Sequence, residues 1–128
     1  MKSKKILLVD DSQPFNFLSR VTIQKTIDCN VTEALNGKEA LNAIVKGDCP
    51  DIILLDLNMP VMDGFEFLKE FEKKSKCVNH TKIYILTSST LEEDKVACMA
   101  HKSVKGYFDK PLLPEHLNKI VADFKVAR

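Results

Sequence analysis

The feature that most constrains the fold is a short apolar run, Ile52–Leu55, which ends in the carboxylate of Asp56. Four residues are too few for a helix, and continuous hydrophobicity over this length is typical of a strand buried on both faces of a parallel sheet. Pro60 and Gly64 then interrupt any simple continuation of strand or helix. Asp56 is therefore predicted to lie where a buried strand opens into a loop, which is where open parallel sheets bind ligands.

Three other apolar runs end in polar residues in the same way. They are residues 6–9, followed by Asp10 and Asp11; residues 83–86, followed by Thr87, Ser88 and Ser89; and residues 106–109, followed by Lys110 and Pro111. If the strands are parallel, these polar ends meet at one edge of the sheet. Three carboxylates, a hydroxyl and an ammonium group would then form one site.

Helical segments separate these runs. Helices are expected over residues 14–27, 36–45, 64–75, 91–101 and 114–126. The first strand is expected over residues 4–9, and one more strand over residues 29–34. Asn36 and Asp63 are expected to cap the second and third helices, with Glu39 as a capping-box partner of Asn36. Five alternations of strand and helix predict an α/β fold, with a doubly wound five-stranded parallel sheet. The 128 residues are expected to form one domain, 1–128, without an output domain.

Charge and hydropathy argue against several classes of function. Nineteen basic and 18 acidic residues give a net charge of +1, which gives no reason to expect a nucleic-acid partner. No apolar run approaches the ~18 residues that indicate a membrane span. The basic N-terminus is followed by too few apolar residues for a signal peptide. We therefore expect a cytoplasmic protein that binds neither membrane nor nucleic acid.

The cysteines and histidines show no ligand pattern. Cys29, Cys49, Cys77 and Cys98 are far apart and form no Cys-x-x-Cys motif. Buried or half-buried thiols in a reducing cytosol are expected, with a zinc site or a disulfide as the minor alternative. The three histidines are expected to be surface or helix-end residues; they are His80, His101 and His116.

The predicted site has a clear chemistry if its residues do converge. Asp10, Asp11 and Asp56 would repel one another without a counter-charge. Mg²⁺ is bound by one or two carboxylates while it keeps several waters, so it leaves room for a phosphoryl oxygen. Lys110 could pair with that group or with Asp56, and Thr87 could donate to another phosphoryl oxygen. Together the groups can carry an in-line phosphoryl transfer to a carboxylate nucleophile.

Simpler interpretations of single residues stay open at this point. Asp10 and Asp11 could form a solvated turn, and Thr87 could cap the fourth helix. Lys110 could be a surface lysine, and Tyr107 could serve packing alone. Only the combination favours a site.

The combination resembles the receiver domain of bacterial response regulators in two-component signalling, over about residues 4–124. Four motifs carry the resemblance: Asp10-Asp11, residues 56–64, Leu86-Thr87-Ser88, and residues 107–111. It implies a flavodoxin-like fold with strand order 2-1-3-4-5, in a single-domain, chemotaxis-regulator-like protein. Such a protein is not a conventional enzyme, although it catalyses its own phosphorylation and dephosphorylation.

The resemblance also implies the roles of the acidic residues. Asp56 would accept a phosphoryl group from a phosphohistidine on a sensor histidine kinase or a histidine phosphotransfer protein. Asp11 and Asp56 would bind Mg²⁺, with Mn²⁺ as a substitute, through their side chains. Asn58 would bind the ion through its backbone carbonyl, and Asp10 would do so through water.

The remaining motif residues would read the phosphoryl group. Thr87 and Tyr107 would be the switch residues, and Lys110 and the backbone of Ser88 would contact the phosphoryl oxygens. The Lys110–Pro111 peptide bond would be cis, which costs little before proline. The face formed by the fourth helix, the fifth strand and the fifth helix would then change its conformation. An unknown downstream protein would bind this face and receive the signal. A homodimer through the last two helices is left open.

One position of the sequence departs from the pattern of the family. Ser103-Val104 stand where many receivers have Gly-Ala, which puts the turn before the fifth strand in doubt.

The alternative function is a Mg²⁺-dependent phosphatase with an aspartyl-phosphate intermediate, but that chemistry needs an acid where this chain has Asn58. A flavin or nucleotide carrier would need a phosphate cradle after the first strand, where Asp10 would repel phosphate.

Overall fold

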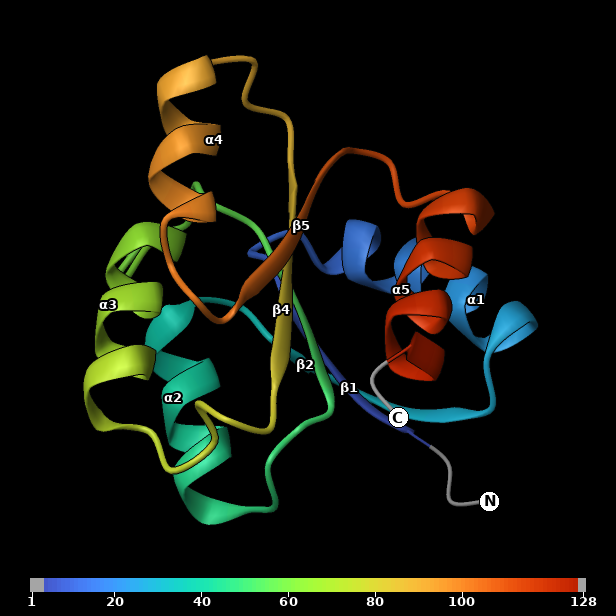
Figure 1. Cartoon of the computed structure of the whole chain (residues 1–128), viewed down its shortest axis with the longest axis horizontal. Coiled ribbons are helices and arrows are strands. Elements are labelled where there is room, and N and C mark those ends of the chain that lie inside the picture. The colour runs from blue at the N-terminus through green and yellow to red at the C-terminus, as the bar shows by residue number, and fades with distance from the viewer. Residues whose placement is uncertain (1–3, 127–128) are drawn as a thin grey trace.

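The computed structural model describes residues 4–126 and consists of alternating strands and helices (Figure 1). In chain order the elements are β1 (Lys4–Val9), α1 (Gln13–Thr26), β2 (Cys29–Ala34), α2 (Gly37–Lys46), β3 (Ile52–Leu55), α3 (Gly64–Lys74), β4 (Lys82–Thr87), α4 (Glu92–Met99), β5 (Val104–Asp109) and α5 (Pro114–Val126). The predicted alternation is therefore confirmed.

The strands form one parallel sheet in the order β2-β1-β3-β4-β5, as expected. In Figure 1, α1 and α5 lie on one face of the sheet and α2, α3 and α4 on the other. Right-handed crossovers produce this arrangement and leave the carboxyl ends of all five strands at one edge. No helix in the described part of the chain is both long and apolar enough to cross a bilayer.

The core consists of two clusters, one on each face of the sheet. Leu7 and Ile53 belong to the cluster under α2 and α3, whereas Ile6 and Ile52 belong to the cluster under α1 and α5. Successive residues of a strand point to opposite faces. The continuous apolar runs in the sequence therefore reflect strands that are covered on both sides.

The caps of α2 and α3 agree with those expected from the sequence, with one exception. Asp63 and Glu66 form a capping box at the start of α3. Asn36 caps α2 by accepting the N–H of Glu39. The expected capping box is wrong in detail there, because Glu39 Oε1 accepts from Leu35 N rather than from the cap residue.

The turn before β5 forms without a glycine. Ser103 donates its N–H to Glu72 Oε2 on α3 at 2.8 Å, and β5 begins at the next residue. Within residues 4–126, Val61 is the one non-glycine residue with positive φ, at 70°. Ser103 therefore does not need the left-handed conformation that would favour glycine, and an anchor on α3 fixes this turn.

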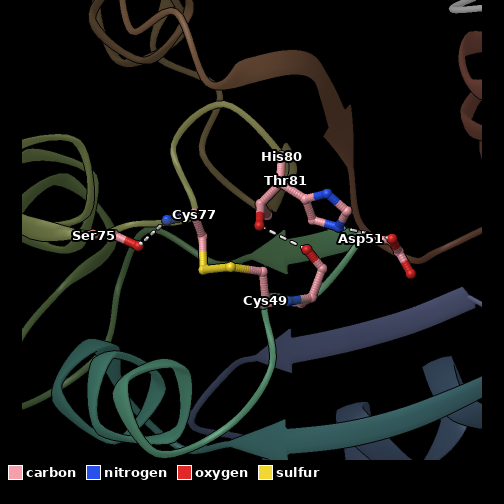
Figure 2. The surroundings of a disulfide bond; sticks show 7 residues. Cys49, Asp51, Ser75, Cys77, His80 and Thr81 are labelled. Carbon is pink, nitrogen blue, oxygen red and sulfur yellow. Dashed lines mark hydrogen bonds and ion pairs between the residues drawn. A yellow bond between two sulfur atoms is a disulfide. The ribbon is translucent and has the colours of Figure 1, made fainter.

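The expectation of free thiols was wrong for two of the four cysteines. Cys49 and Cys77 form a disulfide with a Cα–Cα distance of 5.5 Å (Figure 2), whereas Cys29 and Cys98 are free. Cys49 precedes β3 and Cys77 precedes β4. Because β3 and β4 are paired neighbours in the sheet, the loops that lead into them lie side by side, and a separation of 28 residues in sequence did not reveal this.

Candidate functional site

The backbone of the sheet brings two of the predicted acids together. Asp56 N donates to Val9 O at 2.9 Å, and Asp10 N donates to Ala34 O at 3.1 Å. These bonds extend the parallel ladder by one step beyond β1 and β3. They fix Asp10 and Asp56 side by side at the carboxyl edge, as the sequence predicted.

Asp10, Asp11 and Asp56 form one acidic cluster. Each offers a carboxylate oxygen within 4.8 Å of the others, a spacing that a single metal ion could bridge. Asp10 and Asp56 are buried, at 4% and 6% exposure, whereas Asp11 is exposed. Three hard oxygen donors with one open to solvent suit a divalent cation that retains water. The interpretation of Asp10 and Asp11 as a solvated turn therefore fails for Asp10.

Lys110 supplies the positive charge opposite these acids. Its Nζ lies 2.6 Å from Asp10 Oδ2 and 3.6 Å from Asp56 Oδ2. The expected cis peptide bond between Lys110 and Pro111 is present. Lys110 N also donates to Thr87 O at 3.0 Å. Lys110 is therefore not a free surface lysine, and it pairs more closely with Asp10 than with Asp56.

The electrostatic environment of Asp56 is set by its neighbours. Burial, and then the adjacent Asp10 carboxylate, raise the pKa of the Asp56 carboxyl above its ordinary value. Lys110 and the backbone N–H groups of Leu57 and Asn58 act in the opposite direction. The pKa stays raised because one ammonium group does not compensate desolvation and like-charge repulsion together.

The acceptor loop packs directly against the start of α3. Gly64 N donates to Leu57 O at 2.9 Å. A Cβ at Gly64 would lie 2.5 Å from Asp56 O and 2.8 Å from Leu57 Cα, which is closer than real Cβ contacts. Glycine is thus required at this position by close approach of the backbone. Asn58, whose carbonyl was predicted to bind the metal, is exposed on this loop.

The predicted switch residues lie at the ends of β4 and β5. Thr87 is completely buried, and its Oγ1 accepts the N–H of Ser89 at 3.2 Å. It therefore does not cap α4, whose N-cap residue Leu91 makes no side-chain cap bond. Ser88 is exposed beside it. Tyr107 is half-buried, and its hydroxyl is buried without a hydrogen-bond partner among residues 4–126.

Two residues of α1 contribute to the site although they were not predicted to do so. Asn16 is buried and donates Nδ2 to Asp10 O at 2.9 Å, which anchors the loop after β1. Phe15 places its ring 4.3 Å from Lys110 Nζ. One signal was available for Asn16, since it shares a helical face with the buried Ser19 and Ile23.

The structure is a doubly wound α/β sheet with three acids and a lysine at its carboxyl edge, and comparison with known proteins identifies its family. The family described as the response regulator receiver domain matches residues 6–122. This chain therefore belongs to the response regulator receiver family of two-component signalling and is a phosphorelay receiver. This is a receiver family and not a conventional enzyme family.

Relatives of several architectures share this domain. The chain is 33% identical over 117 residues to the sensor histidine kinase CheAY of Helicobacter pylori. This match covers 91% of the chain but only 14% of that kinase. It is 29% identical to a chemotaxis protein CheY homologue of Campylobacter jejuni, which covers 93% of the chain and 90% of that protein. A crystal structure of a two-component response regulator from Cytophaga hutchinsonii has a TM-score of 0.89 at 29% identity, covering 96% of this chain and 97% of that one.

Proposed function

We propose that Asp56 is the phospho-acceptor of this receiver and that its phosphoryl group comes from a phosphohistidine on a histidine kinase or a phosphotransfer protein. The observation that carries the proposal is the position of Asp56. It is a buried carboxylate, 3.6 Å from the Lys110 ammonium and within 4.8 Å of two further acids. In the transfer, a carboxylate oxygen of Asp56 forms a bond to phosphorus, and the bond from phosphorus to the donor nitrogen breaks.

We propose Mg²⁺ as the cofactor, with Mn²⁺ as a substitute. The oxygen donors of Asp10, Asp11 and Asp56 fit such an ion, because hard divalent cations prefer carboxylate oxygens. Asp11 and Asp56 would bind it directly, Asp10 through water and Asn58 through its backbone carbonyl. The ion supplies charge neutralisation of the phosphoryl oxygens.

The chain's own groups orient the transfer. Lys110 can pair with a phosphoryl oxygen while it keeps its ion pair with Asp10. The ammonium group would then have an acidic partner before and after the transfer. Thr87 can turn its hydroxyl to donate to a second oxygen, and the backbone of Ser88 can donate to the same group. Hydrogen-bond donors aimed at the phosphoryl oxygens stabilise the negative charge that these oxygens carry during transfer.

We propose that phosphorylation is read out on the face formed by α4, β5 and α5. Movement of Thr87 toward the phosphoryl group would free space for Tyr107, which pairs with Ile85 in the register of β4 and β5 and so shares a sheet face with Thr87. Several apolar side chains of or next to α4 are exposed, namely Leu91, Val96 and Met99. They fit a downstream protein or a second copy of the chain. We further propose that this receiver acts in the cytoplasm.

A phosphatase with an aspartyl-phosphate intermediate is not favoured. Asn58 occupies the position two residues past Asp56 where such an enzyme carries its general acid, and an amide cannot donate a proton to a leaving group. The one acid among residues 57–63 is Asp63, which is not buried and caps α3.

The acceptor assignment is tested with acetyl phosphate and Mg²⁺, with detection by intact mass. We expect one phosphoryl adduct on the wild type, none on Asp56→Asn, and none after chelation of the metal. The matched control is Asp109→Asn, which removes an exposed carboxylate at the same edge of the sheet and should leave the adduct unchanged. An adduct on Asp56→Asn at the wild-type rate would refute the assignment.

A further inference from the structure

The Cys49–Cys77 disulfide lies at the amino edge of the sheet, away from the acidic cluster. Cys77 is completely buried in the core cluster, and Cys49 is half-buried against the same cluster. Figure 2 shows the bond between the loops that lead into β3 and β4. Cys49 is thus the more accessible residue of the pair, so an external thiol would reach the disulfide from its side.

The two loops are also joined by bonds that do not depend on sulfur. Thr81 Oγ1 donates to Pro50 O at 2.6 Å, and Lys82 N donates to Asp51 O at 3.0 Å. His80 Nε2 lies 3.0 Å from Asp51 Oδ1. Reduction of the disulfide would therefore leave the loops in place and the two thiols facing each other.

Cys77 is held in position on its own side of the pair. Its N–H is accepted by Ser75 Oγ at 2.9 Å, and its carbonyl accepts the N–H of Thr81 at 2.9 Å. A thiol fixed in this way has a high effective concentration toward its partner, so closure is intramolecular and does not need the loops to search for each other.

We propose that Cys49–Cys77 is a reversible thiol–disulfide exchange site for small-molecule thiols and disulfides of the glutathione type. In oxidation, a thiolate at Cys49 attacks glutathione disulfide, forming a mixed disulfide and releasing one glutathione thiolate. The Cys77 thiolate then attacks the Cys49 sulfur and releases the second. The two cysteine protons pass to the two glutathione thiolates, and two electrons pass from the cysteine pair to glutathione disulfide. Reduction reverses both steps.

The other cysteines do not compete in this exchange. Burial raises the pKa of the Cys98 thiol to about 11, and Cys98 is completely buried. Burial, and then the nearby Asp28, also raise the pKa of Cys29. Neither residue has a disulfide partner among residues 4–126, so neither can complete the second, intramolecular step that releases glutathione.

The disulfide encloses the part of the receiver that carries the proposed phosphorylation site. The ring that the disulfide closes contains β3, the acceptor Asp56 and all of α3. Its redox state would therefore set whether the segment that carries the phosphorylation site is covalently closed. This proposal does not rest on the acceptor role of Asp56, because the exchange occurs at the opposite edge of the sheet.

The test equilibrates the folded protein in buffers of graded reduced-to-oxidised glutathione ratio, then denatures it and alkylates the free thiols with N-ethylmaleimide. We expect the number of alkylated cysteines to fall from all four in the chain to two as the buffer becomes more oxidising. Peptide mapping should place the change at Cys49 and Cys77. Asp56→Asn should give the same curve. A constant number of alkylated cysteines across the series, whether two or four, would overturn the proposal.

Single variants test the asymmetry of the site in a Cys29→Ala background. Cys77→Ala should take up one glutathionyl group at Cys49, whereas Cys49→Ala should take up none at the buried Cys77. Equal labelling of both variants, or labelling only at Cys77, would show that Cys49 is not the exposed partner. Far-ultraviolet circular dichroism identifies any variant that unfolds, and the wild-type series decides the main question independently of the variants.

Discussion

The two edges of the sheet are completed by different kinds of contact. At the carboxyl edge, Asp10, Asp11 and Asp56 face the single ammonium of Lys110, and Asp56 has a raised pKa. At the amino edge, a disulfide and a set of hydrogen bonds join the loops before β3 and β4. The carboxyl edge retains repulsion that a ligand can relieve, whereas the amino edge needs nothing further. The two ends of the same strands thus differ in whether their charges and hydrogen bonds are balanced without a ligand.

Removal of Lys110 should have the largest effect on stability. Lys110→Met leaves the buried Asp10 and Asp56 carboxylates without a counter-charge, and loss of one partner of such a group typically costs about 4 kcal/mol. We expect urea denaturation without metal to show this loss of unfolding free energy. Saturating Mg²⁺ should recover part of it, because a bound cation also neutralises the acids.

The matched control for this variant is Lys105→Met. Lys105 is exposed, and its ammonium donates to Lys102 O in the same region of the chain. Its loss should change the unfolding free energy by no more than about 0.5 kcal/mol. Equal destabilisation of the two variants would mean that the charges at the carboxyl edge are not coupled.

Opening the amino edge should have the next largest effect. Reduction of Cys49–Cys77 releases a ring with a sequence separation of 28, and cross-links of this loop length stabilise a fold by about 3 kcal/mol in the chain-entropy model. The unfolding free energy should fall by that amount in a thiol buffer, and Cys49→Ala/Cys77→Ala should show no response to the thiol. The same denaturation midpoint for the oxidised and reduced wild type would contradict the account of this edge.

The smallest effect concerns the anchor of the turn before β5. Burial raises the pKa of the Glu72 carboxyl, but the hydrogen bond from the Ser103 N–H and the contact with His101 outweigh it, so the pKa lies below its ordinary value. A depressed carboxyl pKa stabilises the fold above the unfolded-state pKa, and this contribution is lost as the pH falls through the folded-state pKa. Glu72→Gln should therefore cost about 1 kcal/mol at neutral pH, with a smaller difference below about pH 4.

Thermal denaturation over a pH series measures this difference. Glu70→Gln is the control, because Glu70 lies on the same helix and pairs with Lys74 at the surface. A pH-independent cost of Glu72→Gln would show that the carboxylate charge does not hold the turn.

Much of this arrangement was predictable because the apolar runs are short and covered on both faces. The bounds of β1, β2 and β3 agree with the sequence-based expectation. Strand β4 extends to Lys82 and Thr87 because pairing with its neighbours recruits flanking polar residues, which hydropathy cannot show. Helix α4 ends at Met99, earlier than expected, and the side chain of His101 contacts Glu72 instead.

The site was predictable only as far as strand ends determine it. Convergence of Asp10 and Asp56 follows from the adjacent parallel strands β1 and β3, and Lys110 reaches the same edge from the end of β5, which is parallel to them with β4 between. The support from Asn16 and the Phe15 ring depends on how α1 docks on the sheet, and the Cys49–Cys77 bond depends on which loops meet at the amino edge. Such contacts between elements distant in sequence leave little trace in a single sequence.

The most direct test of the difference between the two edges is a calorimetric titration of Mg²⁺ into the wild type, Asp11→Asn and Asp48→Asn. Asp11 is the exposed member of the acidic cluster, whereas Asp48 is an exposed acid next to Cys49 at the amino edge. We predict one binding event in the wild type, a similar one in Asp48→Asn, and at least a tenfold weaker one in Asp11→Asn. Equal binding by Asp11→Asn and the wild type would contradict a metal site at the carboxyl edge.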